Sequence, residues 1–570
     1  VALPHTTVIG RDVIERSQAV DLPSLLASEA GFQFTQSGGR GSASNLFLRG
    51  SAALQVLVLV DGVPLTKQDT TGTVSLEHLM LDQVERVEIV RGNVSAIHGS
   101  GAIGGVIQVF TRKGQGPAKA QLRAEAGSYG SARVAATLSG EAEGTRYTLG
   151  IGRHTWQGFS AMNTDQHPGE NPDRDGYRNT SLHLGLSRDL APGHTVGLRG
   201  QGVDGRFGFD GGGYGSPTDV HLGRATLGTW SVYSHNQITR DWRSELTWSQ
   251  GRERSVYDAT LTAYPYDSWA ISRTRTLNWT NAVALGGWLF TAGAEHQRQA
   301  IDTNDSYGSA LARERDVNAA FAGLSTTAGA HSVQLNLRHD KAEGLAGRST
   351  AYAGYGWQFD PAWKLIASAS TAFNLPPLGY LYDPFSGNPA LRPETARSAE
   401  LGLQWAQGGQ VMRATLFRTR ITDLLQYDFT TFGFNNVSQA ANEGLELSYT
   451  GTLGRAQVHA SLTLQDPVDR ATGQGLARRA RTMASLGASL PVDAWTLGAE
   501  LRHTGARPDS GGRPDLGAYT LVNLTARYRV SPGLDLTARV ENLFDRDYQT
   551  AWGYNQPGRS VFVGMLWTPR

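Results

Sequence analysis

Two polar segments near the start of the chain could bind a ligand through many hydrogen bonds. Residues 36–45 read Gln-Ser-Gly-Gly-Arg-Gly-Ser-Ala-Ser-Asn, and residues 66–73 read Thr-Lys-Gln-Asp-Thr-Thr-Gly-Thr. Hydroxyl, amide and backbone groups dominate both segments. They suit a large neutral or zwitterionic ligand, whereas a carboxylate-bearing ligand would more naturally meet clustered arginine and tyrosine. Flexible surface turns are an equally good interpretation of each residue taken alone.

No arrangement of residues indicates catalysis. The chain contains no cysteine, which excludes disulfides, thiolate metal sites and a cysteine nucleophile. No Ser/His/Asp order or zinc-ligand spacing stands out, and the glycine-rich stretch Gly99–Gly105 lacks the lysine that follows in a phosphate-binding loop. We therefore expect that the protein is not an enzyme and requires no cofactor.

Composition narrows the class of protein. The net charge is +1, from 52 basic and 51 acidic residues, so a polyanion is not expected as partner and nucleic acid is not expected to bind. The 69 glycines and 9% aromatic residues are typical of many strands, tight turns and interfacial aromatic side chains. The sequence contains no run of 18 apolar residues, so it predicts no membrane-spanning helix. The start at Val1 shows no leader pattern, so we expect that a signal peptide has been removed.

From residue 115 onward, apolar and polar residues alternate in segments long enough to cross a bilayer as tilted strands. Residues 522–530 and 534–540 alternate in this way on either side of the turn Ser531-Pro532-Gly533, which predicts a hairpin. One such hairpin would fit a soluble sandwich equally well. The pattern recurs as far back as Tyr147–Ile151, and its polar positions carry charged residues in strand after strand. This favours a wide membrane barrel over residues 115–570 with a wet or plugged lumen.

Residues 1–114 have a different pattern. Short apolar runs at Val56–Val60, Val84–Val90 and Gly105–Phe110 predict strands, and Asp12–Arg16 and Leu22–Ala27 resemble helices. We interpret this region as a small α+β domain.

Linked motifs in this domain resemble the plug of TonB-dependent outer-membrane transporters. They are Leu46–Gly50, Val56–Leu65, Val84–Gly92 and His98–Ile107. The later part of the chain carries matching motifs at Phe373–Pro377, Gly387–Glu394, Ser398–Gly402, Asn442–Glu446 and Glu541–Tyr548. The resemblance implies an all-β membrane barrel of about 22 antiparallel strands with the α+β plug inside its lumen. It also implies a bacterial outer-membrane location, contact with membrane lipid and lipopolysaccharide, and active import of a scarce nutrient driven by the inner-membrane protein TonB.

The same resemblance implies how the plug is held. Arg49 and Arg91 match plug arginines, and Glu400 and Glu446 match barrel glutamates, that form an ionic lock in similar transporters. Bidentate pairing of arginine with carboxylate is the physical reason for these residue types. The alternative is that each is an ordinary charge of the lumen or of a strand end.

The plug motifs, segment Asn171–Tyr177 and the ending Tyr548–Arg559 are most similar to the cobalamin (vitamin B12) transporter subgroup. This likeness implies cobalamin or a related corrinoid as cargo, met by apical plug loops. The candidate substrate residues are Gln36, Arg40, Ser42, Ser44, Asn45, Lys67, Gln68 and Thr71. In that subgroup, aspartates of early extracellular loops bind calcium. Matching oxygens could come from Asp165, Asp173, Asp175, Asp204 and Asp210, although solvated loops often carry such aspartates.

Other functions remain open at this point. A ferric siderophore or haem uptake receptor would share the architecture, but the 14 histidines are scattered and His98 lies in a plug motif where packing is the better interpretation. A passive porin belongs to another class and would lack the plug. We do not find the expected N-terminal Ton box, because Thr6–Ile14 resembles the start of the folded plug, downstream of where that box belongs; we expect that the box has been removed from this sequence rather than that coupling is unusual. The chain also ends three residues after Trp567, whereas such barrels usually end on an aromatic residue.

Overall fold

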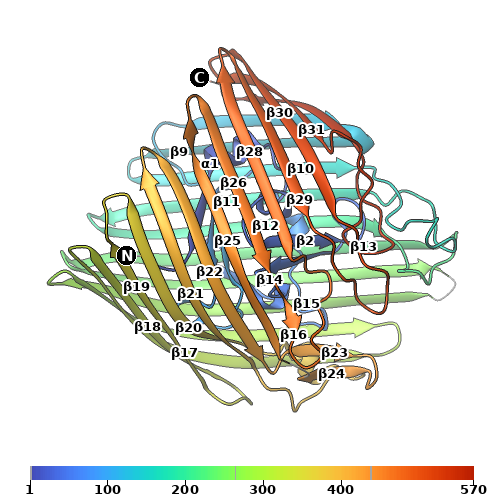
Figure 1. The fold of residues 1–570 in the computed structure, drawn as a ribbon, viewed down its shortest axis with the longest axis horizontal. Helices are drawn as coiled ribbons and strands as arrows, with labels where there is room; N and C mark the ends of the chain where they lie inside the picture. Colours follow the sequence, from blue (N-terminus) through green and yellow to red (C-terminus); the bar gives the residue numbers. More distant parts are fainter. Residues whose placement is uncertain (1–2, 263–264, 437–438, 570) are drawn as a thin grey trace.

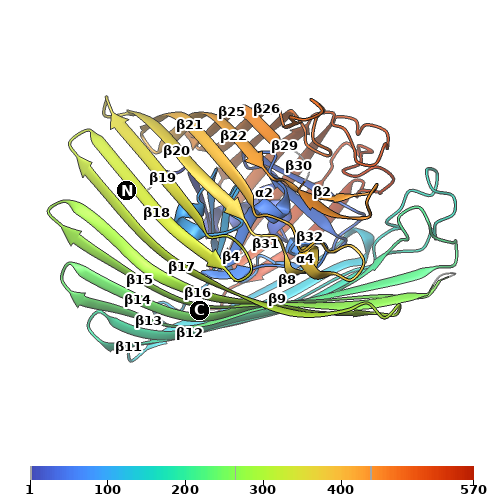
Figure 2. The same ribbon diagram turned by 90° about the horizontal axis from the view of Figure 1, so that it is seen from below.

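The computed structural model describes residues 3–262, 265–436 and 439–569. A closed antiparallel barrel surrounds the N-terminal domain, which lies inside the lumen as a plug (Figures 1 and 2). The barrel contains 22 long strands. It closes where the last strand, β32, pairs with the first, β8, with Trp567 opposite Leu122. The predicted fold class is confirmed.

The barrel strands follow one another around the wall in sequence order. They are β8 (Lys119–Gly127), β9 (Ser131–Ala142), β10 (Thr145–Trp156), β11 (Tyr177–Ala191), β12 (His194–Phe209), β13 (Val220–Thr239), β14 (Trp242–Leu261), β15 (Tyr266–Leu285), β16 (Trp288–Asp305), β17 (Ala310–Ala328), β18 (His331–Ala342), β19 (Arg348–Gln358), β20 (Trp363–Asn374), β21 (Glu394–Gln407), β22 (Gln410–Thr422), β25 (Ala440–Leu453), β26 (Ala456–Gln465), β28 (Thr482–Val492), β29 (Trp495–Thr504), β30 (Tyr519–Ser531), β31 (Leu534–Glu541) and β32 (Ser560–Trp567). The short strand β27 (Val468–Asp469) pairs with β25.

Alternation along each strand sorts side chains between lipid and lumen. In the β30–β31 hairpin, Leu524 and Leu536 face outward and stay 36% and 46% exposed, while Asp535 and Arg539 face inward and are buried. Because neighbouring residues of a strand point to opposite faces, the period of two places apolar groups outside and charged groups inside. None of the helices among the described residues is long and apolar enough to cross a membrane.

The two rims of the barrel differ. At one rim, neighbouring strands are joined by tight turns such as residues 143–144, 240–241 and 286–287. At the other rim, loops are long, as in residues 157–176 and 542–559 (Figure 2). Short turns face the periplasm and long loops the cell exterior in barrels of this kind. The long-loop connections also contain helix α4 (Leu378–Tyr382) and the small hairpin of β23 (Leu425–Asp428) and β24 (Gly433–Asn436).

The plug is built on a five-stranded sheet in the order β1-β6-β7-β4-β5. Its strands are β1 (Thr6–Gly10), β4 (Val56–Val60), β5 (Val63–Leu65), β6 (Val84–Arg91) and β7 (Gly105–Thr111), and a separate hairpin joins β2 (Phe32–Gln36) to β3 (Ser44–Leu48). Only the β4–β7 pair in this sheet is parallel. Residues between Thr111 and Lys119 connect the plug to the barrel.

Short helices cover the plug sheet. They are α1 (Arg11–Ser17), α2 (Leu22–Leu26) and α3 (Ser95–His98), with single 3-10 turns at Ala53–Gln55, Leu76–His78 and, in the barrel, Ser128–Gly130. Helix α2 begins with a capping box, in which Asp21 accepts from the Ser24 backbone N–H and Ser24 accepts in return. Leu22, Leu25 and Leu26 of this helix are buried in the main apolar core of the plug.

Candidate substrate site and plug seal

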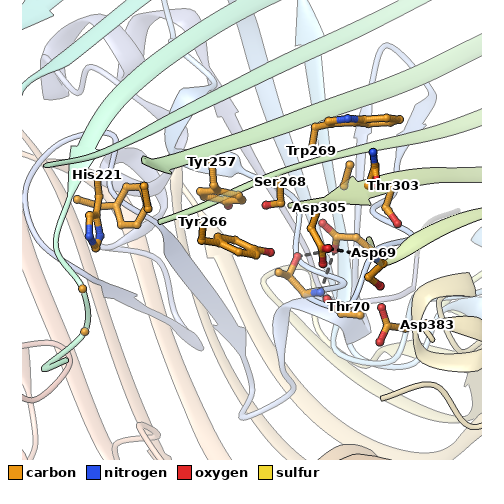
Figure 3. Close-up of a pocket in the computed structure, with 18 of the residues that line it drawn as sticks. Asp69, Thr70, His221, Tyr257, Tyr266, Ser268, Trp269, Thr303, Asp305 and Asp383 are labelled. Carbon is orange, nitrogen blue, oxygen red and sulfur yellow. Dashed lines mark hydrogen bonds between the residues drawn. The ribbon is translucent and has the colours of Figure 1, made fainter. Parts of the chain in front are cut away.

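A cavity of about 610 Å³ opens between the plug and the long-loop rim of the barrel. The plug contributes residues 69–71, and the barrel contributes the outer ends of β12–β17 (Figure 3). We call this space the outer cavity. Its size lies within the range of about 300–1,000 Å³ that is typical of small-molecule sites.

Aromatic rings form one wall of the outer cavity. Phe209 lies between Tyr257 and His221, with ring centroids 5.8 and 5.1 Å away, and Tyr266 stacks on Tyr307 at 5.7 Å. Edge-to-face and stacked contacts hold such rings in place and leave their faces for an apolar ligand surface. Strands β13–β16 are the longest group of neighbouring strands in the barrel, with 18 to 20 residues each, and their length carries these rings to the long-loop side of the plug.

Carboxylates, and no lysine or arginine, line the outer cavity within the described part of the chain. They are Asp69, Asp210, Asp219, Asp305 and Asp383. This differs from the neutral surface expected from the two polar plug segments, because most of the charge comes from the barrel. A polyanionic ligand would meet only repulsion here.

Plug residues 66–72 form the floor of the outer cavity, and we call them the partition loop. Its first three residues are tied to β15: the Oγ1 atoms of Thr66 and Thr274 are 2.6 Å apart, and the Gln68 N–H donates to Ser272 Oγ at 2.8 Å. On its other side, the Gln68 carbonyl accepts from Gly379 N at 2.7 Å. Below the loop lies a second space of about 630 Å³ between the plug and the barrel wall, the inner cavity.

A buried ion cluster supports the partition loop. Lys67 Nζ lies 3.5 Å from Asp69 and 3.4 Å from Glu253. Burial by itself would lower the pKa of Lys67, but these carboxylates outweigh it and hold the pKa above its usual range. Nearby, burial raises the pKa of Glu77 to about 8, and Ser44 Oγ donates to this carboxyl at 2.7 Å. The loop therefore rests on charges that are costly to separate.

Three loop carboxylates lie together beside the outer cavity. Oxygens of Asp173, Asp175 and Asp210 lie within 4.8 Å of one another. Burial, and then the neighbouring Asp210, raise the pKa of Asp175 to about 8. Of the other two candidate calcium ligands, Asp204 instead pairs with Arg224 and Arg206, and Asp165 is exposed elsewhere in its loop. Hard carboxylate oxygens in a flexible loop are ligands that calcium accepts.

On the side opposite the inner cavity, an arginine joins plug to barrel. Arg49 Nε and Nη2 donate to Glu446 at 3.0 and 2.7 Å, and Nη1 donates to Glu400 at 2.8 Å. The Phe417 ring covers the guanidinium at 4.7 Å. The structure does not bring Arg91 into this cluster within ion-pair distance: its guanidinium donates to the Ala30 carbonyl, Thr7 Oγ1 and Glu29 within the plug.

Further charged contacts, which the motifs did not point to, join plug and barrel. Asp82 accepts two hydrogen bonds from Arg133, at 2.7 and 3.1 Å. Arg40 reaches Glu541 of the barrel at 3.2 Å and Asp21 of the plug at 3.4 Å. Buried, bidentate pairs of this kind fix orientation as well as position.

The architecture and contacts have counterparts among known proteins. The model of the TonB-dependent receptor plug domain matches residues 3–106, and that of the TonB dependent receptor-like beta-barrel matches residues 125–543. The second match alone spans more than half of the chain. The chain belongs to the TonB-dependent receptor family.

Individual members of this family show high coverage. The vitamin B12 transporter BtuB of Vibrio cholerae is 30% identical, and the alignment covers 99% of this chain and 92% of that protein. A single-residue mutant of the ferric enterobactin receptor PfeA of Pseudomonas aeruginosa superposes with a TM-score of 0.85 at 19% identity, covering 100% of this chain and 98% of that one. The siderophore receptor PirA of Acinetobacter baumannii gives 0.86 at 16%, covering 99% and 98%. At such identities the two structures support the fold alone.

Membership of the TonB-dependent receptor family establishes an outer-membrane protein with a function in TonB-dependent transport. The predicted family and location are confirmed, and the passive porin is ruled out as the interpretation of this chain, since a plug domain occupies the lumen. The family comprises transporters and receptors rather than enzymes.

The candidate substrate residues are divided among several places. Thr71 lines the outer cavity, while Lys67 and Gln68 line the inner cavity. The other five candidates, Gln36, Arg40, Ser42, Ser44 and Asn45, line neither. Gln36 is held by Thr550, whose Oγ1 bonds both its N–H and its carbonyl.

Sequence reasoning missed the aromatic wall. Tyr257, Tyr266 and Trp269 lie within a short stretch around the connection between β14 and β15, and this local enrichment was the available signal. Phe209 and His221 come from other strands, and nothing in their own segments links them to that stretch.

Proposed function

We propose that this protein imports a corrinoid, with cobalamin as its main cargo, by TonB-dependent active transport. The observation that carries the proposal is the relationship to the vitamin B12 transporter BtuB, which extends over 99% of this chain at 30% identity. A relationship of that coverage includes the plug apex and the loops as well as the barrel. The solved neighbours named as siderophore receptors are less similar in sequence.

The chemistry of the outer cavity supports this cargo over a ferric siderophore. Its aromatic wall, with Tyr257, Tyr266 and Trp269, offers apolar faces, and its hydroxyl groups offer hydrogen bonds. The lining carboxylates and the lack of cationic side chains among the described lining residues oppose an anionic iron complex. A neutral or zwitterionic corrinoid meets no such repulsion.

The N-terminal end of the plug supports coupling to TonB. Leu3 N–H donates to Gln334 of β18 at 3.1 Å, and Leu3 packs beside Gly354 and Gly356 of β19. These positions lie close to the tight-turn rim, which faces the periplasm in this family. Leu3 therefore lies on the side from which the inner-membrane partner arrives, and that partner would engage its receptor by strand addition.

Calcium completes the proposal. Asp173, Asp175 and Asp210 would hold the ion through carboxylate oxygens, and the ion would neutralise charges that now raise one another's pKa. Asp210 also lines the outer cavity, so an ion here would order loop residues around the cargo.

Binding measurements on the purified protein test the cargo. We expect cyanocobalamin to bind, with higher affinity when calcium is present, and ferric enterobactin and haem to bind weakly or not at all. Titration calorimetry with and without a chelator measures this. Binding of ferric enterobactin without any affinity for cobalamin would overturn the corrinoid assignment and favour a siderophore receptor, while leaving the transporter family unchanged.

A further inference from the structure

A small pocket lies at the tight-turn end of the lumen, between the connection from plug to barrel and strands β10–β13. Its volume is about 250 Å³, and we call it the basic pocket. Residues 112–115 of the connection form one side of it. The strands form the other sides, and Arg146 of β10 lies two residues after the tight turn at 143–144. Because such turns face the periplasm, the basic pocket lies at the periplasmic end of the lumen.

Basic side chains, and no carboxylate, line this pocket within the described part of the chain. They are Arg112, Lys113, Arg146, Arg199 and His235. The outer cavity has the opposite character, since carboxylates line it without any lysine or arginine among the described residues. An anionic group is therefore attracted to the basic pocket and repelled at the outer cavity.

Carboxylates outside the basic pocket offset only part of its charge. The pairs are Arg146–Asp189 at 2.6 Å, Arg112–Glu15 at 3.7 Å and His235–Glu245 at 3.9 Å. Lys113 and Arg199 form no ion pair with any described residue, and the Arg199 guanidinium lies over the Tyr233 ring at 4.3 Å. Partial burial, and then repulsion from Arg199, lower the pKa of Lys113, although Asp61 offsets part of this effect. The two side chains are thus cations without an anion between them.

Glycines in the barrel wall make room for the side chains of the pocket. In the antiparallel register, Gly185 of β11 lies between Thr148 of β10 and Arg199 of β12. Gly197 of β12 lies opposite Tyr233 of β13. A Cβ atom at Gly185 would come within 2.7 Å of Thr148 Cγ2, and one at Gly197 within 2.2 Å of the Tyr233 ring. A larger residue at either position would push these side chains into the pocket.

Two polar atoms at the basic pocket are buried without a partner. Thr148 is 2% exposed, and its Oγ1 makes no hydrogen bond with any described residue. The Nε–H of Arg112 makes none either within the same part of the chain. A buried polar group without a partner costs free energy. Phosphate oxygens in the pocket would supply the missing acceptors.

The basic pocket continues the inner cavity. The residues that line both spaces are Lys113, Arg199, Tyr233 and His235. A cargo that passes the partition loop and fills the inner cavity therefore reaches this pocket before it leaves the barrel. The pocket is smaller than the range of about 300–1,000 Å³ that is typical of sites for whole small molecules. It suits one charged group of the cargo rather than the entire molecule.

We propose that the basic pocket binds the phosphodiester group of the corrinoid cargo at the periplasmic end of the inner cavity. The inference rests on the proposed function, because cobalamin carries its negative charge on the phosphodiester of its nucleotide. Guanidinium groups donate paired N–H groups to phosphate oxygens. Arg199 and Lys113 form no ion pair that the phosphodiester would have to displace. The cargo thus gains an ionic contact that the outer cavity does not offer.

Calorimetry on the purified protein tests the pocket directly. The outer cavity is first saturated with cyanocobalamin, and α-ribazole 3′-phosphate, the nucleotide portion of cobalamin, is then titrated in. We expect this phosphate ester to bind more tightly than α-ribazole without phosphate and more tightly than inorganic phosphate. Arg199→Gln should weaken its binding about tenfold, through loss of one charge-assisted contact.

Two further variants control for folding and for charge. Lys113→Gln should weaken binding of the phosphate ester as well, and both variants should fold normally because neither residue forms an ion pair with a described residue. Arg188→Gln is the matched control. Arg188 is exposed on β11 and points away from the lumen, next to Ser187 of the pocket, so this variant removes the same charge and should bind normally.

Uptake into cells separates binding of the cargo from a structural role. Cobinamide is a corrinoid without the nucleotide and its phosphodiester. Arg199→Gln should lower the uptake of labelled cyanocobalamin severalfold relative to that of cobinamide, because only the first cargo loses an ionic contact on its way out.

The outcomes distinguish this site from the proposed function. Equal affinity of Arg199→Gln and the unaltered protein for the phosphate ester would overturn the site, as would equal affinity for α-ribazole or inorganic phosphate. An equal loss of uptake for both corrinoids would also overturn it. In all these cases cyanocobalamin still binds in the first step of the titration. A protein that bound no cyanocobalamin would overturn the corrinoid assignment itself, and this site with it.

Discussion

The plug meets the barrel in two different ways on its two sides. Toward strands β21–β28 it is held by the buried Arg49 cluster and by close backbone contacts, such as the Ser28 carbonyl accepting from Ser461 Oγ at 2.9 Å. Toward strands β13–β17 it borders the inner cavity, and among the described contacts the partition loop and its neighbour Ser75 make the direct polar bonds to the wall.

This difference indicates how a passage could open without expelling the plug. The partition loop, residues 66–72, lies between the outer and inner cavities. Moving this loop would join the two spaces along the β13–β17 side, while the firmly held side could stay in place. Such a movement would break the hydroxyl contact of Thr66 with Thr274 and the buried ion pair of Lys67 with Glu253, whereas the bidentate pair of Arg49 with Glu446 on the other side would stay intact.

The largest expected effect comes from fixing the partition loop to the barrel wall. The variant Thr66→Cys with Thr274→Cys should form a disulfide that stops transport, because the hydroxyl groups it replaces lie 2.6 Å apart and the bond would tie the partition loop to β15. The natural chain has no cysteine, so no other pairing competes. Uptake of labelled cobalamin into cells, before and after reduction, measures the effect.

The matched control forms a disulfide within the barrel wall. Ser461→Cys with Ser485→Cys joins β26 to β28, where the two hydroxyl groups lie 2.8 Å apart, and it should leave uptake unchanged after oxidation. Loss of uptake in both oxidised variants would mean that oxidation alone impairs the transporter. Normal uptake in both would place the passage elsewhere.

A second prediction breaks the firm side. Glu446→Ala should lower the free energy of unfolding by about 3–5 kcal/mol, because it leaves the buried guanidinium of Arg49 without its bidentate partner. Glu443 lies on β25, as Glu446 does, and forms an exposed ion pair with Arg418 of β22. Glu443→Ala should lower the free energy of unfolding by only about 0–1 kcal/mol. Thermal unfolding measures both, and influx of a large antibiotic reports whether the seal leaks. Equal losses of unfolding free energy in the two variants would show that the Arg49 cluster stabilises the protein no more than an exposed ion pair does.

A third prediction concerns pH and calcium at the loop carboxylates beside the outer cavity. The pKa of Asp175 is raised to about 8, so the folded protein holds this proton more tightly than the unfolded chain. Without calcium, this group's contribution to stability should therefore fall as the pH rises from about 4 through about 8. Calcium competes with the proton, so its affinity should rise over the same window. Terbium luminescence and calorimetry check this, and Asp175→Asn should abolish the pH dependence.

The smallest expected effect lies in the aromatic wall. Tyr266→Ala should weaken cobalamin binding by about 1 kcal/mol, roughly fivefold in Kd, through loss of one stacked ring. Tyr355→Ala, which removes an exposed ring on the outer wall of β19, is the control and should bind normally. An unchanged Kd for Tyr266→Ala would place the cargo away from the outer cavity.

Much of the fold was predictable because its causes are local. Alternation with a period of two places side chains on opposite faces of any strand, so residues 522–530 and 534–540 identified a hairpin without knowledge of its neighbours. The strands at Val56–Val60 and Val84–Arg91 were equally visible as apolar runs. The plug and barrel motifs then pointed to Arg49, Glu400 and Glu446, which the structure brings into contact.

What the sequence by itself determined was the wall of the membrane barrel, the separate domain inside it and the residue types available to join them. Only the tertiary structure decided that Arg91 bonds within the plug, that Thr71 but not Gln36 reaches the outer cavity, and that cavities border the plug on one side of the barrel. The reason is physical: alternation sets which way a side chain points, but strand length, stagger and closure of the barrel set which distant side chains meet.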